Sequence, residues 1–294
     1  GGGHVLGPVG GRGPGFMRVV DGDDLQIDGL RRLGEVVDLL GVDAAGLAAV
    51  NEAALAGAFQ VTEKNPLVGL SGRVHLLGAL ARALEARPDV FGPEGRIGGM
   101  VDWLCERAQD GVIAAPEVLA LVLDALGGIW PGRLQLDGIP LGDVWQHAAV
   151  GGEGKTRGLL PLHKLSQWLS YSLIHPLQVA GLTVSGLSEL TGLAEYRNGG
   201  LFIDAGVLVP KRPEVLTQAH EVSSELVVES RGLTVALLDR MLPLVQRELG
   251  VTEAQLPLPA MLEGGSWAAG RELAQARRAG GSPPLHIVSD GTVF

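Results

Sequence analysis

Apolar residues recur at spacings of three and four along most of this chain, and that spacing constrains the fold more than any other feature. It places apolar side chains on one face of a helix, whereas a strand would alternate them. Residues 74–86 show the pattern clearly, with Leu76, Leu80 and Leu84 on one face before Arg87-Pro88 ends the helix. Further helices are predicted at residues 30–40, 44–59, 97–108, 116–126, 163–179, 221–250 and 261–279, and the one at 221–250 is expected to bend or break near Pro243.

Strand signals are few. Asp137-Gly138, within residues 133–141, is a turn signal typical of a hairpin, and residues 286–288 predict a terminal strand. Residues 147–158 are rich in glycine and are predicted to form a flexible loop. The predicted fold class is therefore mainly α, an α+β chain with a small β component.

The composition excludes several classes of function. A net charge of -10, from 33 acidic and 23 basic residues, argues against a broad nucleic-acid surface, which needs a basic excess. Cys105 is the only cysteine, so no internal disulfide can form, and a reducing compartment is indicated. No apolar stretch is long enough to span a membrane and no signal-peptide core is present, so we expect a cytoplasmic location. We expect no cofactor, and homo-oligomerisation stays open.

The chain is predicted to divide at residue 41. Residues 1–41 form a glycine-rich segment that we expect to be partly disordered, because residues 1–15 carry too little apolar surface to offset the entropy of ordering. Residues 42–294 form the predicted helical domain.

Three familiar motifs are incomplete. Gly154-Lys155-Thr156 resembles a phosphate-binding loop, but Ala149 occupies the position of the required glycine. His220-Glu221 begins like a zinc-protease motif, but Ser224 replaces the second histidine, and the seven histidines show no ligand spacing. Residues 69–73 lack the order of a serine-hydrolase elbow. Neither metal catalysis nor serine hydrolysis is expected.

A polar stripe follows the helix predicted at residues 163–173. Lys164, Gln167 and Tyr171 share a face at spacings of three and four, opposite a stripe of leucines. The sequence holds only four lysines and two tyrosines, so this grouping is informative. The alternative is a solvated outer face with Tyr171 packed at its edge.

A second polar run lies within residues 191–204. Glu195, Tyr196, Arg197 and Asn198 stand between apolar flanks, which would draw their side chains inward, where charges need partners or a function. The alternative is an internal salt bridge between Glu195 and Arg197 without any chemistry.

A third group consists of glutamates four residues apart. Glu221, Glu225 and Glu229 would stack along one helix and repel one another unless solvent, Arg197 or Arg231 compensates them. A solvated acidic face is the alternative, and it fits Glu221 better than Glu225.

Longer motifs resemble the uracil-catabolism protein family. The matching stretches are Phe59-Gln60-Val61, Asn65 to Leu70, Arg87 to Gly92, Ile129 to Arg133, Leu141 to Trp145, His163 to Leu173, Leu190 to Val209, Glu263 to Trp267 and Ser289 to Phe294. The likeness covers residues 42–294. Members of that family usually carry a longer, structured region before the position of residue 42. This chain has its glycine-rich segment there, so the substrate pocket of this chain could lack a wall.

The same three polar groups are more remotely similar to queuosine-salvage nucleotide glycosidases, whose fold resembles helical DNA glycosylases. Lys164 and Gln167 match a Lys-x-x-Gln-like helix of that family, Glu195-Tyr196-Arg197 matches its acidic-Tyr-Arg run with Glu in place of Asp, and Glu225 to Arg231 matches its acidic helix ending in Arg.

Together these resemblances imply a hydrolase of N-glycosidic bonds, acting in uracil catabolism on a ring-opened ribosyl 5-phosphate of urea type. In this hypothesis Glu195 is the carboxylate at the anomeric carbon, with Asp204 in reserve. The substrate-binding residues would be Lys164, Gln167, Tyr171, Tyr196, Arg197, Asn198, Glu225 and Arg231. Two alternatives stay open: a non-catalytic metabolite-binding or scaffold protein of the pathway, and an amide or ureide hydrolase.

Overall fold

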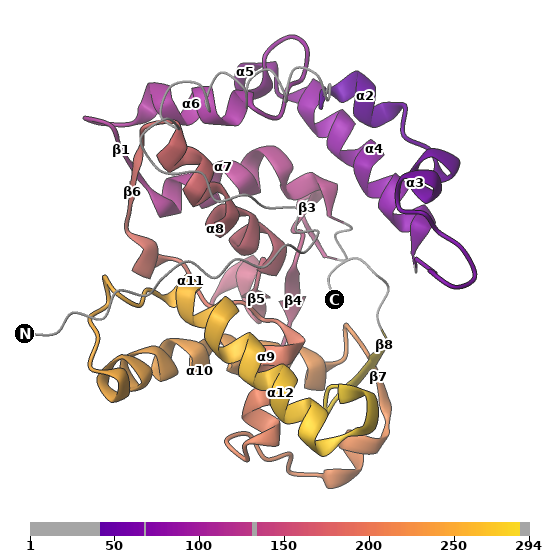
Figure 1. Ribbon diagram of the computed structural model, residues 1–294, viewed down its shortest axis with the longest axis vertical. Coiled ribbons are helices and arrows are strands. Elements are labelled where there is room, and N and C mark those ends of the chain that lie inside the picture. The colour runs from indigo at the N-terminus through magenta and orange to yellow at the C-terminus, as the bar shows by residue number, and fades with distance from the viewer. Residues whose placement is uncertain (1–41, 68, 131–133, 289–294) are drawn as a thin grey trace, which may run out of the picture. The chain divides into compact units, whose positions relative to one another are not determined.

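The structure is a computed structural model that describes residues 42–67, 69–130 and 134–288 (Figure 1). These described residues belong to one compact unit by their internal contacts. The expectations for residues 1–41, including the disordered tail and the helix at residues 30–40, lie outside the described residues.

Helices dominate the described chain, which confirms the mainly α prediction. The α-helices are α2 (Ala44–Ala48), α3 (Glu52–Ala58), α4 (Leu70–Ala86), α5 (Pro88–Phe91), α6 (Gly99–Arg107), α7 (Ala115–Leu126), α8 (Lys164–Val179), α9 (Tyr196–Asp204), α10 (Glu225–Leu249), α11 (Leu258–Met261) and α12 (Ala268–Arg277). The single turns are η1 (Gly127–Ile129), η2 (Gly154–Thr156), η3 (Leu187–Glu189), η4 (Pro213–Thr217), the π-helical η5 (Leu262–Trp267) and η6 (Ala279–Gly281).

The β component consists of short paired strands. The pairs are β1 (Val112–Ala114) parallel to β6 (Thr183–Ser185), β2 (Gln135–Leu136) antiparallel to β3 (Ile139–Pro140), β4 (Val144–Gln146) antiparallel to β5 (Leu159–Pro161), and β7 (Ala219–Glu221) parallel to β8 (His286–Val288). The predicted hairpin is β2–β3, where Asp137 and Gly138 both have a positive φ, as a type I′ turn requires. The predicted terminal strand is β8.

Two helix predictions need correction. The stretch at 44–59 is not one helix, because Asn51 accepts a hydrogen bond from the backbone N–H of Ala54 and so starts α3 after α2 has ended. The helix predicted at residues 221–250 starts only at Glu225, and it runs through Pro243 without a break. It ends at Gly250, whose positive φ suits a helix C-terminus.

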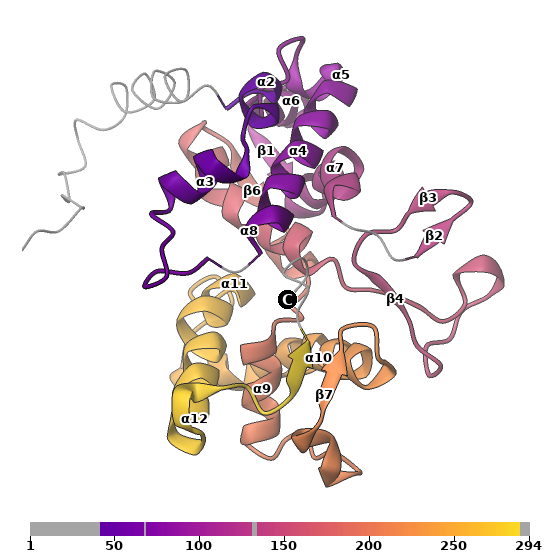
Figure 2. The ribbon, with the colours of Figure 1, turned by 90° about the vertical axis from the view of Figure 1, so that its right-hand side faces the viewer.

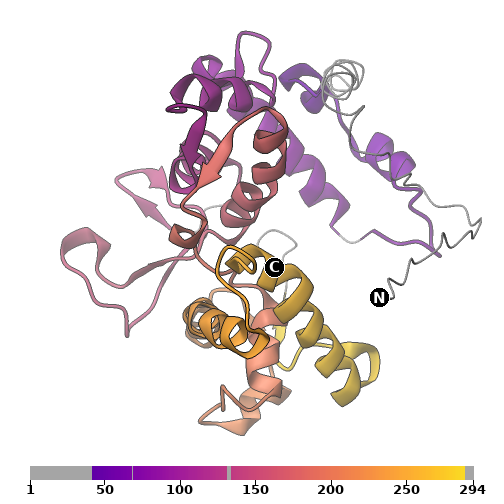
Figure 3. The ribbon, with the colours of Figure 1, turned by 60° about the vertical axis from the view of Figure 1, so that its left-hand side comes forward.

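The first core cluster joins the helices of the N-terminal half to α8. Buried side chains of α4, α6 and α7 pack with Leu177 of α8, and Leu169 and Leu173 of the same helix cover them. Figures 1 and 3 show α8 beside α7, in agreement with their contacts. One face of α8 is therefore fixed by this core.

The C-terminal half holds two further clusters. In one, Trp145, Leu162 and Ala194 pack against Val228 of α10, and in the other Leu193 and Phe202 pack against Leu238. Helix α9 contacts α10, α12 and η5 (Figures 1 and 2). The N-terminus of α9 is thereby fixed between elements that come from distant parts of the sequence.

Candidate functional site

Four charged side chains are buried where these elements meet. Asp143 lies just before β4, Lys164 begins α8, Glu195 precedes α9, and Arg231 lies in α10. Their exposed fractions are 5%, 5%, 6% and 3%. Burying charge is unfavourable unless the groups are paired, so this cluster must be held by specific contacts.

Asp143 is the centre of those contacts. Its carboxylate accepts two parallel bonds from Arg231, each of 2.8 Å, and one of 2.5 Å from Nε1 of Trp145. It also accepts the backbone N–H of Lys164 at 2.9 Å and so caps α8 from outside the helix. Burial opposes ionisation of Asp143, but the bonds and charge of Arg231 outweigh it and hold the pKa of this carboxyl below its ordinary value.

Glu195 caps the next helix. Its Oε2 accepts the backbone N–H of Arg197 at 2.7 Å and that of Asn198 at 3.2 Å. Burial nevertheless raises the pKa of Glu195, while those two bonds and then the charge of Lys164 act in the opposite direction. Glu195 is thus a fixed carboxylate in a poorly hydrated position.

Lys164 is the cation that acts most strongly on Glu195. Burial, reinforced by the positive charge of Arg231, lowers the pKa of Lys164 from 10.5 to about 8, although Glu195 and Asp143 both oppose the shift. The predicted polar stripe on α8 is therefore an inner face: Lys164 and Gln167 are buried, which excludes the solvated alternative for both of them.

A cavity of about 390 Å³ opens beside Glu195. It is lined by Trp168, Tyr171, Ser172, Leu193, Glu195, Asn198, Pro259, Leu262 and Trp267. Glu195 is the one charged side chain among the described residues that line it. A small ligand with an apolar or ring face and several hydroxyl groups suits such walls, because aromatic rings offer apolar surface while the amide and carboxylate offer hydrogen bonds.

Hydrogen bonds between elements hold the wall in place. Tyr171 donates its hydroxyl to the carbonyl oxygen of Thr191 at 2.9 Å, and Oε1 of Gln167 accepts the Thr191 N–H at 3.4 Å. Asn198 accepts a bond of 2.9 Å from the hydroxyl of Ser266, which lies in the π-helical η5. Of the predicted stripe on α8, Tyr171 lines this cavity together with Glu195 and Asn198 of the predicted run. Lys164 and Gln167 are not among the described residues that line it.

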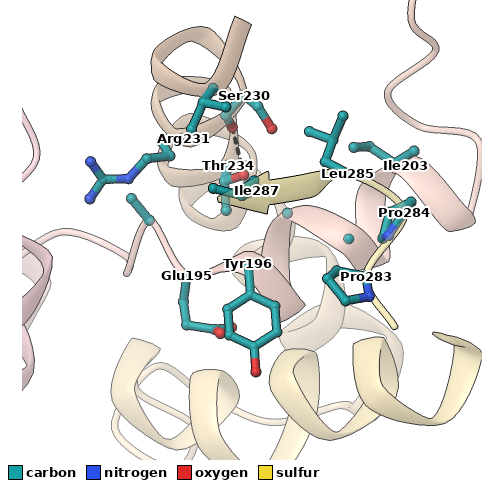
Figure 4. A pocket seen from close by; sticks show the side chains of 14 residues that line it. Glu195, Tyr196, Ile203, Ser230, Arg231, Thr234, Pro283, Pro284, Leu285 and Ile287 are labelled. Carbon is teal, nitrogen blue, oxygen red and sulfur yellow. Dashed lines mark hydrogen bonds between the residues drawn. The ribbon is translucent and has the colours of Figure 1, made fainter. Parts of the chain in front are cut away.

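Figure 4 shows the other side of the α9 N-terminus. Glu195 and Tyr196 begin the helix there, near Pro283 and Leu285 of the segment that leads into β8. The alternative, an internal salt bridge between the side chains of Glu195 and Arg197, does not form. Arg197 contacts Glu195 through its backbone N–H, and its guanidinium donates a bond of 2.6 Å to the carbonyl oxygen of Gly281.

The remaining predicted residues lie elsewhere. Asp204 is at the far end of α9, roughly 12 Å along the axis at 1.5 Å per residue, and forms two hydrogen bonds with Arg278. Glu225 is exposed and accepts the Ala148 N–H at 3.2 Å, so it holds the loop at residues 147–158 and does not reach the cavity. Arg231 belongs to the buried charge cluster through Asp143.

Sequence reasoning missed Asp143, Trp168 and Trp267 as site residues. Each lay within a stretch that carried the family resemblance, but no spacing rule connects residues so far apart in the chain. The available signal was Gly142-Asp143, an acid that follows a glycine of positive φ and directly precedes strand β4. In the described part of the chain no three potential metal ligands cluster, and no described helix is long and apolar enough to cross a membrane.

Fold and site define a mainly helical protein in which two carboxylates and two cationic side chains are buried together, beside a cavity lined by aromatic residues. A family model described as "Protein of unknown function (DUF1688)" matches residues 35–294. The chain belongs to this family.

Two curated relatives are similar over most of the chain. "Uracil catabolism protein 4" of Lachancea kluyveri is 41% identical over 263 residues, covering 80% of this chain and 59% of that protein. "Protein urg3" of Schizosaccharomyces pombe is 40% identical over 259 residues, covering 86% of this chain and 61% of that protein. The chain thus spans about three fifths of the length of the curated relatives it matches. The resemblance to the uracil-catabolism family is confirmed, whereas the likeness to DNA-glycosylase folds stays a prediction.

Proposed function

We propose that this chain acts in uracil catabolism by hydrolysing the N-glycosidic bond of a ring-opened ribosyl compound of urea type. The name of the Lachancea relative supports the pathway. The observation that carries the reaction is a fixed, buried carboxylate, Glu195, in the wall of a cavity that also offers aromatic and amide side chains.

The chemistry follows from the charge that develops during the reaction. When the bond between C1 of the ribose and the nitrogen breaks, positive charge builds on the sugar, and the carboxylate of Glu195 stabilises it or attacks C1. The urea nitrogen leaves as the C1–N bond breaks, and water then forms the new C1–O bond. The proton that this water loses balances the proton that the urea nitrogen gains. Two backbone N–H groups already hold Glu195, so little reorganisation is needed at that moment.

The other side chains fall into supporting roles. Asn198 and the hydroxyl of Tyr171 bind sugar hydroxyls, while Trp168 and Trp267 cover the faces of the substrate. Lys164 favours the ionised form of Glu195, although burial and the two cap bonds affect the pKa of that carboxyl more. Because the described lining of the cavity contains no cation, the 5-phosphate extends out of it toward solvent.

Glu195→Gln tests the proposal directly. A glutamine oxygen can still accept both cap bonds, so the fold is kept while the negative charge is lost. We expect kcat/KM for release of urea from ribosyl-urea 5-phosphate to fall about 10²- to 10³-fold, the usual loss when one stabilising group is removed. Products are measured as urea and ribose 5-phosphate.

Glu225→Gln is the matched control, because Glu225 is an exposed glutamate outside the cavity. It should retain full activity. Near-normal urea release by folded Glu195→Gln protein would refute the role of Glu195. Thermal stabilisation of the wild-type chain by the substrate without any product would instead identify a binding protein.

A further inference from the structure

A second cavity, of about 720 Å³, lies at the same end of α9. It is lined by Tyr196, Arg197, Leu216, Arg278, Ser282, Pro283, Pro284, Leu285, His286 and Ile287. Its walls come from the first turn of α9, from η4, and from the segment between α12 and β8. No residue that lines this cavity also lines the Glu195 cavity, in the part of the chain that the structure describes.

Helical geometry explains why one helix end serves two cavities. Glu195 and Asn198 are three residues apart and share a face, whereas Tyr196 and Arg197 are rotated away from that face. Within the polar run, Glu195 and Asn198 line the first cavity and Tyr196 and Arg197 line the second, although Glu195 also borders the small hollow beside Tyr196 that Figure 4 shows.

The second cavity has a basic lining in a chain of net charge -10. Two arginines and a histidine line it, and no acidic residue does so among the described residues. Arg278 is neutralised by Asp204 and also donates its Nε–H to the carbonyl oxygen of Ser282, so its position is fixed.

Arg197 differs from Arg278 in what it contacts. Its Nη1 donates to a neutral carbonyl oxygen, that of Gly281, and its buried Nε has no hydrogen-bond partner among the described atoms. The ring of Tyr196 lies 5.0 Å from its guanidinium carbon, which holds the side chain on one side. This Nε is closed off from solvent, so a ligand would contact the part of the guanidinium that lines the cavity. An anion there would add a charge-assisted hydrogen bond that the neutral carbonyl of Gly281 does not supply.

We propose that this second cavity binds the oxyanion of a small metabolite, a phosphate or a carboxylate, separately from the Glu195 cavity. The guanidinium of Arg197 is the principal donor, and Tyr196 and His286 border the bound group. This inference does not depend on the hydrolase activity. It assigns Arg197 and Tyr196, which the sequence predicted to share one substrate site with Glu195, to a binding site of their own.

Calorimetric titration of the full chain at pH 7 tests the site, with inorganic phosphate, ribose 5-phosphate and citrate as separate probes. We expect saturable binding of at least one probe, and the comparison of the three distinguishes phosphate from carboxylate. Arg197→Gln should weaken that binding at least tenfold. Arg197→Lys retains the charge but loses the planar guanidinium, so its affinity for the probe should lie between that of the wild type and that of Arg197→Gln. This milder variant decides the question if Arg197→Gln does not fold.

Two controls separate this site from general electrostatics and from the proposed function. Arg277→Gln removes an exposed arginine next to Arg278 that does not line the cavity, and it should leave binding unchanged. Glu195→Gln should also bind the probe as wild type does, even where it has lost hydrolysis. The proposal is overturned if the wild-type protein binds none of the probes. It is also overturned if Arg277→Gln weakens binding as much as Arg197→Gln does, or if both variants of Arg197 bind the probe as the wild type does.

Discussion

Lys164 and Glu195 are neighbouring buried charges whose ionisation the protein shifts toward neutrality. Burial lowers the pKa of Lys164 to about 8 and raises that of Glu195 above its ordinary value. The proposed reaction needs Glu195 ionised and Lys164 protonated, because only that pair places a stabilised negative charge at the sugar. The two residues therefore set a window of pH for activity.

We expect a bell-shaped dependence of kcat/KM on pH. As pH falls, Glu195 takes up a proton at a higher pH than an ordinary glutamate, so the acid limb lies above pH 4.5. As pH rises through about 8, Lys164 loses its proton and the alkaline limb begins. Lys164→Arg keeps the charge at all accessible pH values, so any activity it retains should lack that limb.

The pH profile of the variant distinguishes a charge role from a structural one. A merely structural Lys164 would leave the alkaline limb in place in Lys164→Arg protein. Rates measured from pH 4 to 10 with folded wild-type and variant protein decide between the two.

Residue spacing predicted which side chains share a face but not which face is inside. Lys164, Gln167 and Tyr171 do share one side of α8, as their spacing implied. The start of this helix is held by Asp143, whose carboxylate accepts the backbone N–H of Lys164 and binds Arg231, 21 and 88 residues away in the chain. Such pairings are decided by the tertiary fold, and local periodicity carries no information about them.

At the scale of elements, the contact between α9 and α12 positions the site. Gly270 of α12 faces α9 so closely that a Cβ there would lie 2.2 Å from the carbonyl oxygen of Arg197. A methyl group would push apart the two helices next to the cap made by Glu195. This contact explains why a glycine is found within an otherwise regular helix.

Gly270→Ala should therefore destabilise the protein although alanine is the better helix former. The overpacking should cost about 1–3 kcal/mol of unfolding free energy. Proposed activity should fall as well, since the cap of α9 moves. Gly72→Ala in α4 is the control: a Cβ there meets nothing within 4 Å, so stability should rise by about 0.5–1 kcal/mol. Urea unfolding of both variants measures the difference, and equal stabilisation by the two would contradict the packing explanation.

Elements with strong periodicity were predictable, whereas their ends and irregular turns were not. Residues 74–86, 116–126 and 163–179 lie in α4, α7 and α8 much as predicted, because their apolar spacing and proline signals agree. The cap at Asn51, which divides residues 44–59, carries a readable signal that helical spacing alone obscures. The π-helical η5 has no such signal, and yet it places Ser266 against Asn198.

At the scale of the whole molecule, the buried charge cluster lies where the three core clusters meet. Trp145 belongs to one cluster, α8 packs into another, and α10, which carries Arg231, contributes Leu238 to the third. The carboxylate of Asp143 accepts hydrogen bonds from Trp145, from the start of α8 and from Arg231 of α10. A change at this one side chain should consequently be felt in the global stability of the domain and not only at the cavity.

Asp143→Asn should lower the free energy of unfolding by about 3–5 kcal/mol, because it leaves Arg231 buried without its paired charge. Asp124→Asn is the comparison: it also removes an aspartate paired with an arginine, Arg87, but that pair is exposed to water and its loss should matter far less. Denaturant unfolding at pH 7 measures both. If the two substitutions lower the free energy of unfolding equally, the buried pair of Asp143 and Arg231 stabilises the protein no more than an exposed pair does. If Asp143→Asn alone causes the large loss, its carboxylate joins the three clusters, and the geometry of Lys164 and Glu195 depends on it.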